Sequence, residues 1–212
     1  MITGLFEIHI SVDPRHILEL RMYCMDHKIK PIMACADSGI NRNQLMISKW
    51  KNGTEKEAIE RALYIANDMK SYGLIVQRIK VEAMAHNQGV PQHPNNDVSP
   101  SKYFEFHIKY HINSKADYDE IKSVCHQFDR SIGLSFSAFK ETIKVLVTIR
   151  VSGHLGYINA EKVKDDLINK LKEHHIHSND DIQKEFSVYD DNIKYDAGWL
   201  GTIGCFSPKI EN

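Results

Sequence analysis

A short alternating pattern that occurs twice constrains the fold of this chain more than any other feature. The sequence FEIHI at residues 6–10 returns as FEFHI at residues 104–108, 98 positions later. Each copy alternates apolar and polar residues, which is typical of a strand with one buried face. We therefore expect two equivalent strands, each with a glutamate and a histidine on its polar face.

The same order of elements is expected after each copy. In the first half, strands are expected at 30–37, 45–50 and 74–84. One helix follows Asp13-Pro14, and another begins at a capping box of Thr54 and Glu57. The order strand-helix-strand-strand-helix-strand is that of a ferredoxin-like unit.

The second half repeats this order. Strands are expected at 103–112, 132–139, 143–151 and 185–190, with one helix through Ile121 and Cys125 and another capped by Asn159. We therefore predict an α+β fold of two tandem ferredoxin-like (βαββαβ) repeats with mainly antiparallel sheets. Residues 1–86 form the first repeat, residues 87–102 a linker rich in proline and asparagine, and residues 103–212 the second repeat with a C-terminal tail.

Bulk composition excludes several classes of protein. The net charge is −1 and no long basic run occurs, so DNA binding is not expected. No apolar stretch approaches the roughly 20 residues of a membrane span, and the N-terminus lacks a signal-peptide pattern. The cysteines are scattered, which predicts reduced thiols in a cytoplasmic protein and no structural zinc site: Cys24, Cys35, Cys125 and Cys205.

The polar faces of the two repeats supply the candidate site. Helices should cover one face of each sheet, so the opposite faces can line a cleft between the repeats. A shift of 101 residues aligns Lys49 with Arg150, which would set a cation near each histidine, although a one-residue slip of the third strand would reverse its faces. The residues expected in the cleft are Glu7, His9, Ser11, Lys49, Glu105, His107, Lys109 and Arg150.

Two histidines facing each other suit chemistry on a phosphate ester. Histidine titrates near neutral pH, so His9 and His107 can act as base and acid. Lysine and arginine would stabilise the charge that develops on phosphoryl oxygens. We therefore expect a metal-independent phosphodiesterase that needs no cofactor, with a small phosphate ester as its substrate.

The motif His9-Ile10-Ser11-Val12 resembles the His-apolar-Thr/Ser-apolar motif of the two-histidine phosphoesterases. In that family, two related α+β lobes each give one such motif to a central cleft. The resemblance implies that His9 and His107 are the acid-base pair, that Ser11 holds phosphate, and that the substrate is a cyclic phosphate or an RNA end. The second copy departs from the motif, because Lys109 stands where the family has threonine or serine.

A second resemblance covers nearly the whole chain. The phrases MISKW, KVEAM, YFEFHIK, TIRV and DAGW are similar to those of a family of uncharacterised bacterial proteins. This resemblance supports the boundaries given above and draws attention to Lys49, Lys140, Arg150, Asp196 and Trp199. It implies no activity.

Other interpretations stay open. The two histidines can simply be strand residues paired with glutamates, and the cleft can belong to a noncatalytic module that binds a small anion or a protein partner. A weaker alternative is RNA binding on an open sheet face, a mode that favours exposed aromatic residues. His174, His175 and His177 lie at a helix end and lack metal-site spacing, so no metal is predicted there.

Overall fold

The structure is a computed structural model that describes residues 1–129, 132–139, 144–178 and 182–200. Two residues named above, Lys140 and Cys205, therefore lie outside the described residues. The first half contains β1 (Thr3–Val12), the 3-10 turn η1 (Pro14–His16), α1 (Ile17–His27), β2 (Lys30–Ala36), β3 (Asn43–Thr54), α2 (Glu55–Ser71) and β4 (Val76–Met84).

The second half has the same order of strands and α-helices. It contains β5 (Tyr103–His111), α3 (Lys115–Phe128), β6 (Gly133–Ser137), β7 (Lys144–Ser152), the 3-10 turn η2 (Gly153–Leu155), α4 (Gly156–Glu173) and β8 (Gln183–Asp190). A last 3-10 turn, η3 (Ile193–Asp196), follows β8. The prediction of a mixed α+β fold with antiparallel strands is confirmed.

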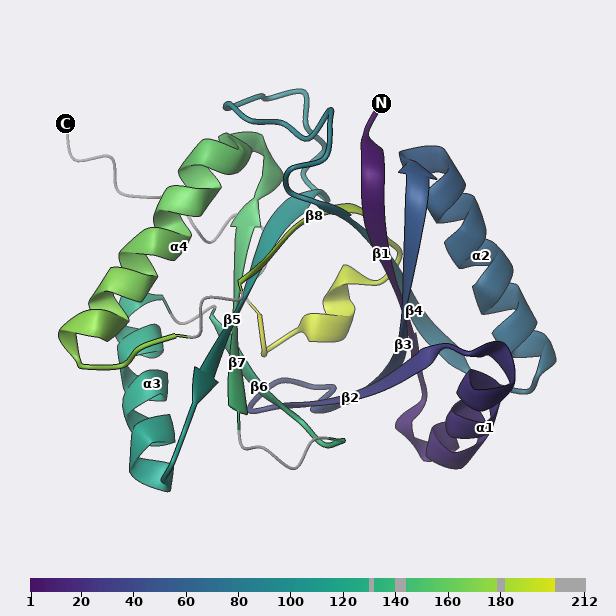
Figure 1. Cartoon of the computed structure of the whole chain (residues 1–212), viewed down its shortest axis with the longest axis horizontal. Helices are drawn as coiled ribbons and strands as arrows, with labels where there is room; N and C mark the ends of the chain where they lie inside the picture. Colours follow the sequence, from purple (N-terminus) through teal and green to yellow (C-terminus); the bar gives the residue numbers. More distant parts are fainter. Residues whose placement is uncertain (130–131, 140–143, 179–181, 201–212) are drawn as a thin grey trace.

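The eight strands close into one antiparallel barrel in the order β1-β3-β2-β6-β7-β5-β8-β4. Each half contributes four neighbouring strands, and the pairs β2–β6 and β4–β8 join the halves. Helices α1 and α2 lie outside the barrel beside the first half, and α3 and α4 lie outside it beside the second (Figure 1). The expected cleft is therefore the enclosed interior of the barrel.

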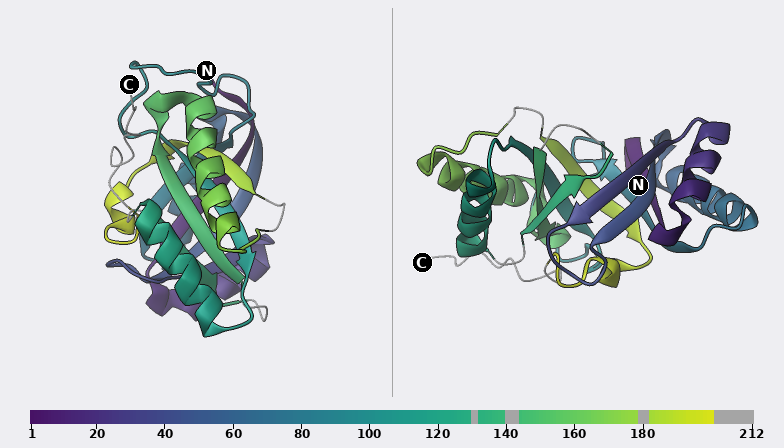
Figure 2. Two further views of the ribbon diagram at one scale, coloured as in Figure 1. Left: turned by 90° about the vertical axis from the view of Figure 1, so that its left-hand side faces the viewer. Right: turned by 90° about the horizontal axis from the view of Figure 1, so that it is seen from below.

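The helices cover the apolar outer face of the strands. On β1, Phe6, Ile8 and Ile10 are fully buried, and α2 packs against β1, β3 and β4. The stripe that α2 buries includes Ala62 and Met69. Figure 2 shows α3 and α4 packed side by side on the opposite flank. The apolar core thus lies between helices and barrel, which leaves the inner face of the strands to polar residues.

Local signals explain where the helices begin. Thr54 and Glu57 form the expected capping box at the start of α2, and Ser114 and Asp117 form an equivalent box at α3. The prediction that Asn159 caps the last helix is wrong, because α4 already begins at Gly156. The Asn159 side chain instead donates a hydrogen bond to the Leu155 carbonyl from within the first turn.

The segment after β8 closes one end of the barrel. In Figure 1, η3 lies across the opening of the ring of strands, and the left view of Figure 2 places it at one end. Trp199 Nε1 donates a hydrogen bond to the Leu134 carbonyl on β6. The close approach requires glycine at position 133, where a Cβ atom would lie 2.5 Å from Trp199 Nε1. No helix among the described residues is long and apolar enough to span a membrane.

Candidate functional site

Both copies of the duplicated pattern direct their polar residues into the barrel. The interior holds a cavity of about 250 Å³, and its lining includes Glu7, His9 and Ser11 from β1 with Glu105, His107 and Lys109 from β5. On the neighbouring strands, His9 lies opposite Ser48 and His107 lies opposite Thr148. The structure thus brings the two predicted histidines to equivalent positions around one cavity.

The predicted equivalence of Lys49 and Arg150 is wrong. Lys49 pairs with Ile8, whereas Arg150 pairs with Glu105. Because side chains alternate along a strand, Lys49 shares the outer face of β3 with Ile47 and Arg150 points into the barrel. The correct shift between the third strands is 100 residues, which makes Trp50 the counterpart of Arg150.

A chain of alternating charges crosses the barrel interior. Arg78 contacts Asp190 at 2.6 Å and Asp196 at 2.9 Å, and Arg150 contacts Asp196 at 2.5 Å and Glu105 at 2.6 Å. Lys80 extends the chain, with 2.7 Å from its Nζ to both Glu105 and Glu82. We call these seven residues the ion-pair chain: Asp190, Arg78, Asp196, Arg150, Glu105, Lys80 and Glu82.

Burial makes the ion-pair chain expensive to disrupt. All seven side chains are at most 8% exposed. Tyr103 lies among them, where its hydroxyl donates a 2.6 Å hydrogen bond to Asp190 and its ring lies 4.2 Å from the Arg150 guanidinium carbon. Buried charges are tolerated only when each is paired and hydrogen-bonded. The three cationic groups of the chain are therefore already engaged by protein carboxylates.

Beside the chain lies a second group, which we call the histidine pocket: Glu7, His9, His107, Gln183 and Glu185. The Gln183 amide donates to Glu7 at 2.5 Å and to Glu185 at 2.8 Å, so it ties the two carboxylates together. His107 Nε2 lies 3.2 Å from Glu185 Oε2. His9 Nε2 lies 3.7 Å from Glu7 Oε1, and His9 Nδ1 is buried without a hydrogen-bond partner in the described chain.

The surroundings of the two histidines shift their pKa values in opposite directions. Burial lowers the pKa of His9 and outweighs the negative charges of Glu7 and Glu185, which oppose this shift. Burial alone would also lower the pKa of His107, but the hydrogen bond and negative charge of Glu185 outweigh burial and raise it. One imidazole of the pair therefore favours the neutral form and the other the protonated form.

Carboxylates are in excess inside the barrel. Among the described residues, the buried carboxylates of this region are Glu7, Glu82, Glu105, Glu185, Asp190 and Asp196, and the buried cations are Arg78, Lys80 and Arg150. Lys109 and the more exposed Lys30 add positive charge at the cavity wall. Burial and the nearby negative charge of Glu82 raise the pKa of Glu185 to about 7, which shows how poorly this charge is compensated.

Two members of the histidine pocket were not predicted. Gln183 and Glu185 belong to β8, where the polar residues Glu185 and Ser187 alternate with the apolar Phe186 and Val188. This alternation resembles that of the duplicated pattern and could have revealed the inner face. Asp196, to which the second resemblance drew attention, is a partner of Arg78 and Arg150 because η3 folds across the end of the barrel.

Comparisons with known proteins add little to this geometry. No protein-family model matches the chain, and no curated protein matches it. One solved structure, of an unknown protein from Galdieria sulphuraria, is 12% identical over 88% of this chain and 99% of that chain, with a TM-score of 0.24. That similarity is too remote to support an argument, so the resemblance to uncharacterised bacterial proteins stays a prediction.

Proposed function

We propose that the barrel interior is the active site of an enzyme that hydrolyses a small phosphate ester, with His9 and His107 on its two sides. The observation that carries this proposal is the convergence of both histidine motifs, 98 residues apart in the sequence, on one cavity. Nearly half of the other residues that line this cavity are charged, and a cluster of interacting ionisable groups in a cavity is typical of a functional site.

The two histidines have separate roles in this proposal. His107 lies 3.5 Å from Glu105 and 3.2 Å from Glu185, which favours its charged form, and it donates a proton to the leaving oxygen. His9, whose lowered pKa favours the neutral imidazole, activates the attacking water. The new bond joins that water oxygen to phosphorus, and the bond to the ester oxygen breaks.

Ser11 and Lys109 supply contacts for the phosphate group. Both line the cavity, and each lies two residues beyond a histidine on the same face of its strand. A hydroxyl and an ammonium group are suitable donors to phosphoryl oxygens. Glu105 and Arg150, which were predicted to contact substrate, instead belong to the ion-pair chain and support the site from behind.

Turnover of bis(p-nitrophenyl) phosphate and of 2′,3′-cyclic nucleotides by the purified protein tests the proposal. We expect His9→Ala and His107→Ala each to lower kcat/KM by at least about 100-fold. His126→Ala, which changes an exposed histidine on α3, is the matched control and should retain activity. Activity retained in both pocket variants, or no turnover with any ester, would contradict the proposal.

A noncatalytic binding role is the second candidate. The cations inside the barrel favour this role, because all three form ion pairs with protein carboxylates: Arg78, Lys80 and Arg150. Their charges are therefore less able to stabilise a transition state. Tight binding of a ligand without turnover would support this role. RNA binding on an open sheet face has less support, because the eight described strands enclose the inner face.

We also propose that the barrel consists of two ferredoxin-like repeats derived from one duplicated unit. The strand orders β4-β1-β3-β2 and β8-β5-β7-β6 correspond position by position. Equivalent pairings, such as His9 with Ser48 and His107 with Thr148, support this origin. Separate expression of residues 1–86 would test whether one repeat retains the fold; a chain without cooperative unfolding would argue against an independent unit.

A further inference from the structure

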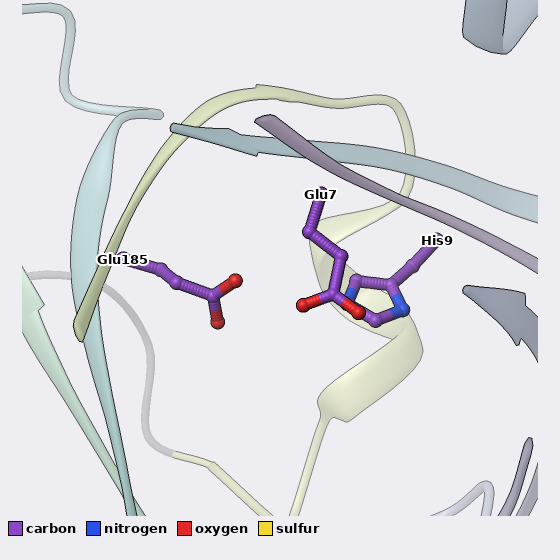
Figure 3. Close-up of side chains that lie close together, drawn as sticks. All are labelled: Glu7, His9 and Glu185. Carbon is purple, nitrogen blue, oxygen red and sulfur yellow. The ribbon is translucent and has the colours of Figure 1, made fainter. Parts of the chain in front are cut away.

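We infer that Glu7, His9 and Glu185 bind a divalent transition-metal ion inside the barrel. One ligand atom from each residue lies within 4.8 Å of the other two. Figure 3 shows the Glu7 and Glu185 carboxylates directed toward each other across a gap, with the His9 ring beside Glu7. Two carboxylates and an imidazole are the mixed oxygen and nitrogen ligands that such ions accept.

The spacing is close to that of a bound ion. Ligand atoms held at about 2.0–2.2 Å from a tetrahedral zinc ion lie about 3.3–3.6 Å apart. The three ligand atoms, which lie within 4.8 Å of one another, therefore need to converge by at most about 1.5 Å, which changes of side-chain torsion angles can provide. The site opens onto the cavity of about 250 Å³, so water or a substrate can complete the coordination.

His9 is the residue that distinguishes this group from an ordinary acidic cluster. Its Nε2 atom faces the carboxylates, 3.7 Å from both Glu7 Oε1 and Glu82 Oε2, and its Nδ1 atom on the other side of the ring is buried without a hydrogen bond to any described residue. Buried polar atoms are nearly always paired in proteins, so an unpaired one requires an explanation. A divalent ion would offset the excess of negative charge around His9. Because neutral imidazole is a common metal ligand, the ion would also give this side chain a function.

The surrounding residues hold the carboxylates in place. Ser48 donates a hydrogen bond to Glu7 Oε1, and Gln183 donates to both Glu7 Oε2 and Glu185 Oε1. His107 contacts Glu185 Oε2 from the other side. Partners of this kind orient the ligands of metal sites and raise their affinity.

The inference deepens the proposed function and rests on it for the role of the ion. A phosphate ester would bring further negative charge into an interior where carboxylates already exceed cations. A divalent ion would reduce that imbalance and could bind a phosphoryl oxygen. His9 would then hold the ion in place of acting as the base, the ion would lower the pKa of the attacking water, and the enzyme would depend on metal, in contrast to the expectation from the sequence.

The ligand set favours Zn²⁺ or Mn²⁺ over Mg²⁺ or Ca²⁺, because imidazole is a poor ligand for the two harder ions. Titration of the EDTA-treated, dialysed full chain with Zn²⁺ and with Mn²⁺ by calorimetry tests this directly. We expect one ion per chain with a Kd below about 10 μM. His9→Ala and Glu185→Gln should each weaken binding by at least about 100-fold.

Matched variants separate this site from an adventitious one. His174→Ala together with His175→Ala removes the histidine run that follows α4 and should leave the affinity unchanged. Circular dichroism and thermal unfolding check that each variant is folded, and Glu7→Gln provides a third ligand variant. Absence of binding in the wild type, or binding lost only in the His174/His175 variant, would overturn the inference.

The same titration distinguishes failure of the metal site from failure of the proposed function. Metal binding without turnover of any ester would support the ion site and contradict the hydrolase. Turnover that persists unchanged in EDTA would support the hydrolase and contradict the ion site.

Discussion

Arg150 and Glu105 face each other across β7 and β5, and the Arg150 Nη2 atom lies 2.6 Å from Glu105 Oε1 inside the barrel. Glu105 also accepts a hydrogen bond from Lys80 at 2.7 Å through its other oxygen. One carboxylate therefore bridges two buried cations. Its removal would break an ion pair of each cation and leave Arg150 with Asp196 and Lys80 with Glu82.

We predict that Glu105→Gln lowers the free energy of unfolding by about 3–5 kcal/mol, the usual cost of breaking a buried ion pair. Urea unfolding followed by circular dichroism measures this change. Glu60→Gln, which removes the partner of an exposed i,i+4 pair with Lys56, is the control and should cost less than about 1 kcal/mol. Equal effects of the two substitutions would contradict the importance of the ion-pair chain.

Acid should destabilise the protein through the same chain. Burial would raise the pKa of Glu105, but the charges of Lys80 and Arg150 outweigh burial and hold it well below its ordinary value. The pKa of Asp190 is also lowered, because Arg78 outweighs the effect of burial. Groups with a depressed pKa stabilise the fold above their unfolded pKa, and this contribution is lost as the pH falls through the folded pKa.

The stability measured by urea unfolding should therefore decrease steadily as the pH is lowered from about 5 toward 2. Glu105→Gln should make this decrease shallower, since one of the depressed groups is absent. A stability that does not change over this interval would show that the carboxylates of the chain are not stabilised by their partners.

The register of β3 gives a prediction that concerns two lysines. Lys109 lines the cavity, whereas Lys49 lies on the outer face of its strand. We expect Lys109→Met to weaken the binding of a phosphate ester by at least about tenfold, since a charged hydrogen bond to phosphate contributes about 1.5–3 kcal/mol. Lys49→Met should leave binding unchanged. The reverse result in a calorimetric titration would mean that the assigned register is incorrect.

The closure of the barrel end by Trp199 predicts a spectroscopic effect. A Cβ atom at Gly133 would lie 2.5 Å from Trp199 Nε1, so Gly133→Ala should displace the indole and break its hydrogen bond to Leu134. In a Trp50→Phe background, we expect the tryptophan emission to shift to longer wavelength and the protein to lose about 1–3 kcal/mol of stability. Ser137→Ala, at an exposed position of the same strand, should change neither property.

Periodicity in the sequence was sufficient to predict most strands and helices and the inner face of β1 and β5. The alternation in FEIHI and FEFHI has a clear physical cause, because one face packs under helices and the other faces the cavity. Thr54 and Glu57 likewise predicted the start of α2 through local hydrogen bonds. These signals depend on near neighbours in the chain, which is why they are readable from it.

Features that depend on contacts distant in sequence were not predicted. The pairing of β4 with β8 joins residues about 100 positions apart, and no local pattern specifies it. The wrong alignment of Lys49 has a related cause, since apolar and polar residues both occur on the two faces of β3 and a one-residue shift changes the apparent face. Glu185 lies near His107 through the pairing of β5 with β8 within the second half, whereas the pairing of β4 with β8 brings it near Glu7 and His9 of the first half.

One measurement tests most directly the central claim that the barrel interior is a ligand site organised around His9 and His107. Crystals grown with Mn²⁺ and inorganic phosphate would be measured by anomalous diffraction at the manganese edge. We predict one anomalous peak between Glu7, His9 and Glu185, with phosphate beside it in the cavity toward Lys109. An interior without either group, with ions or phosphate bound only at the outer surface, would contradict the account.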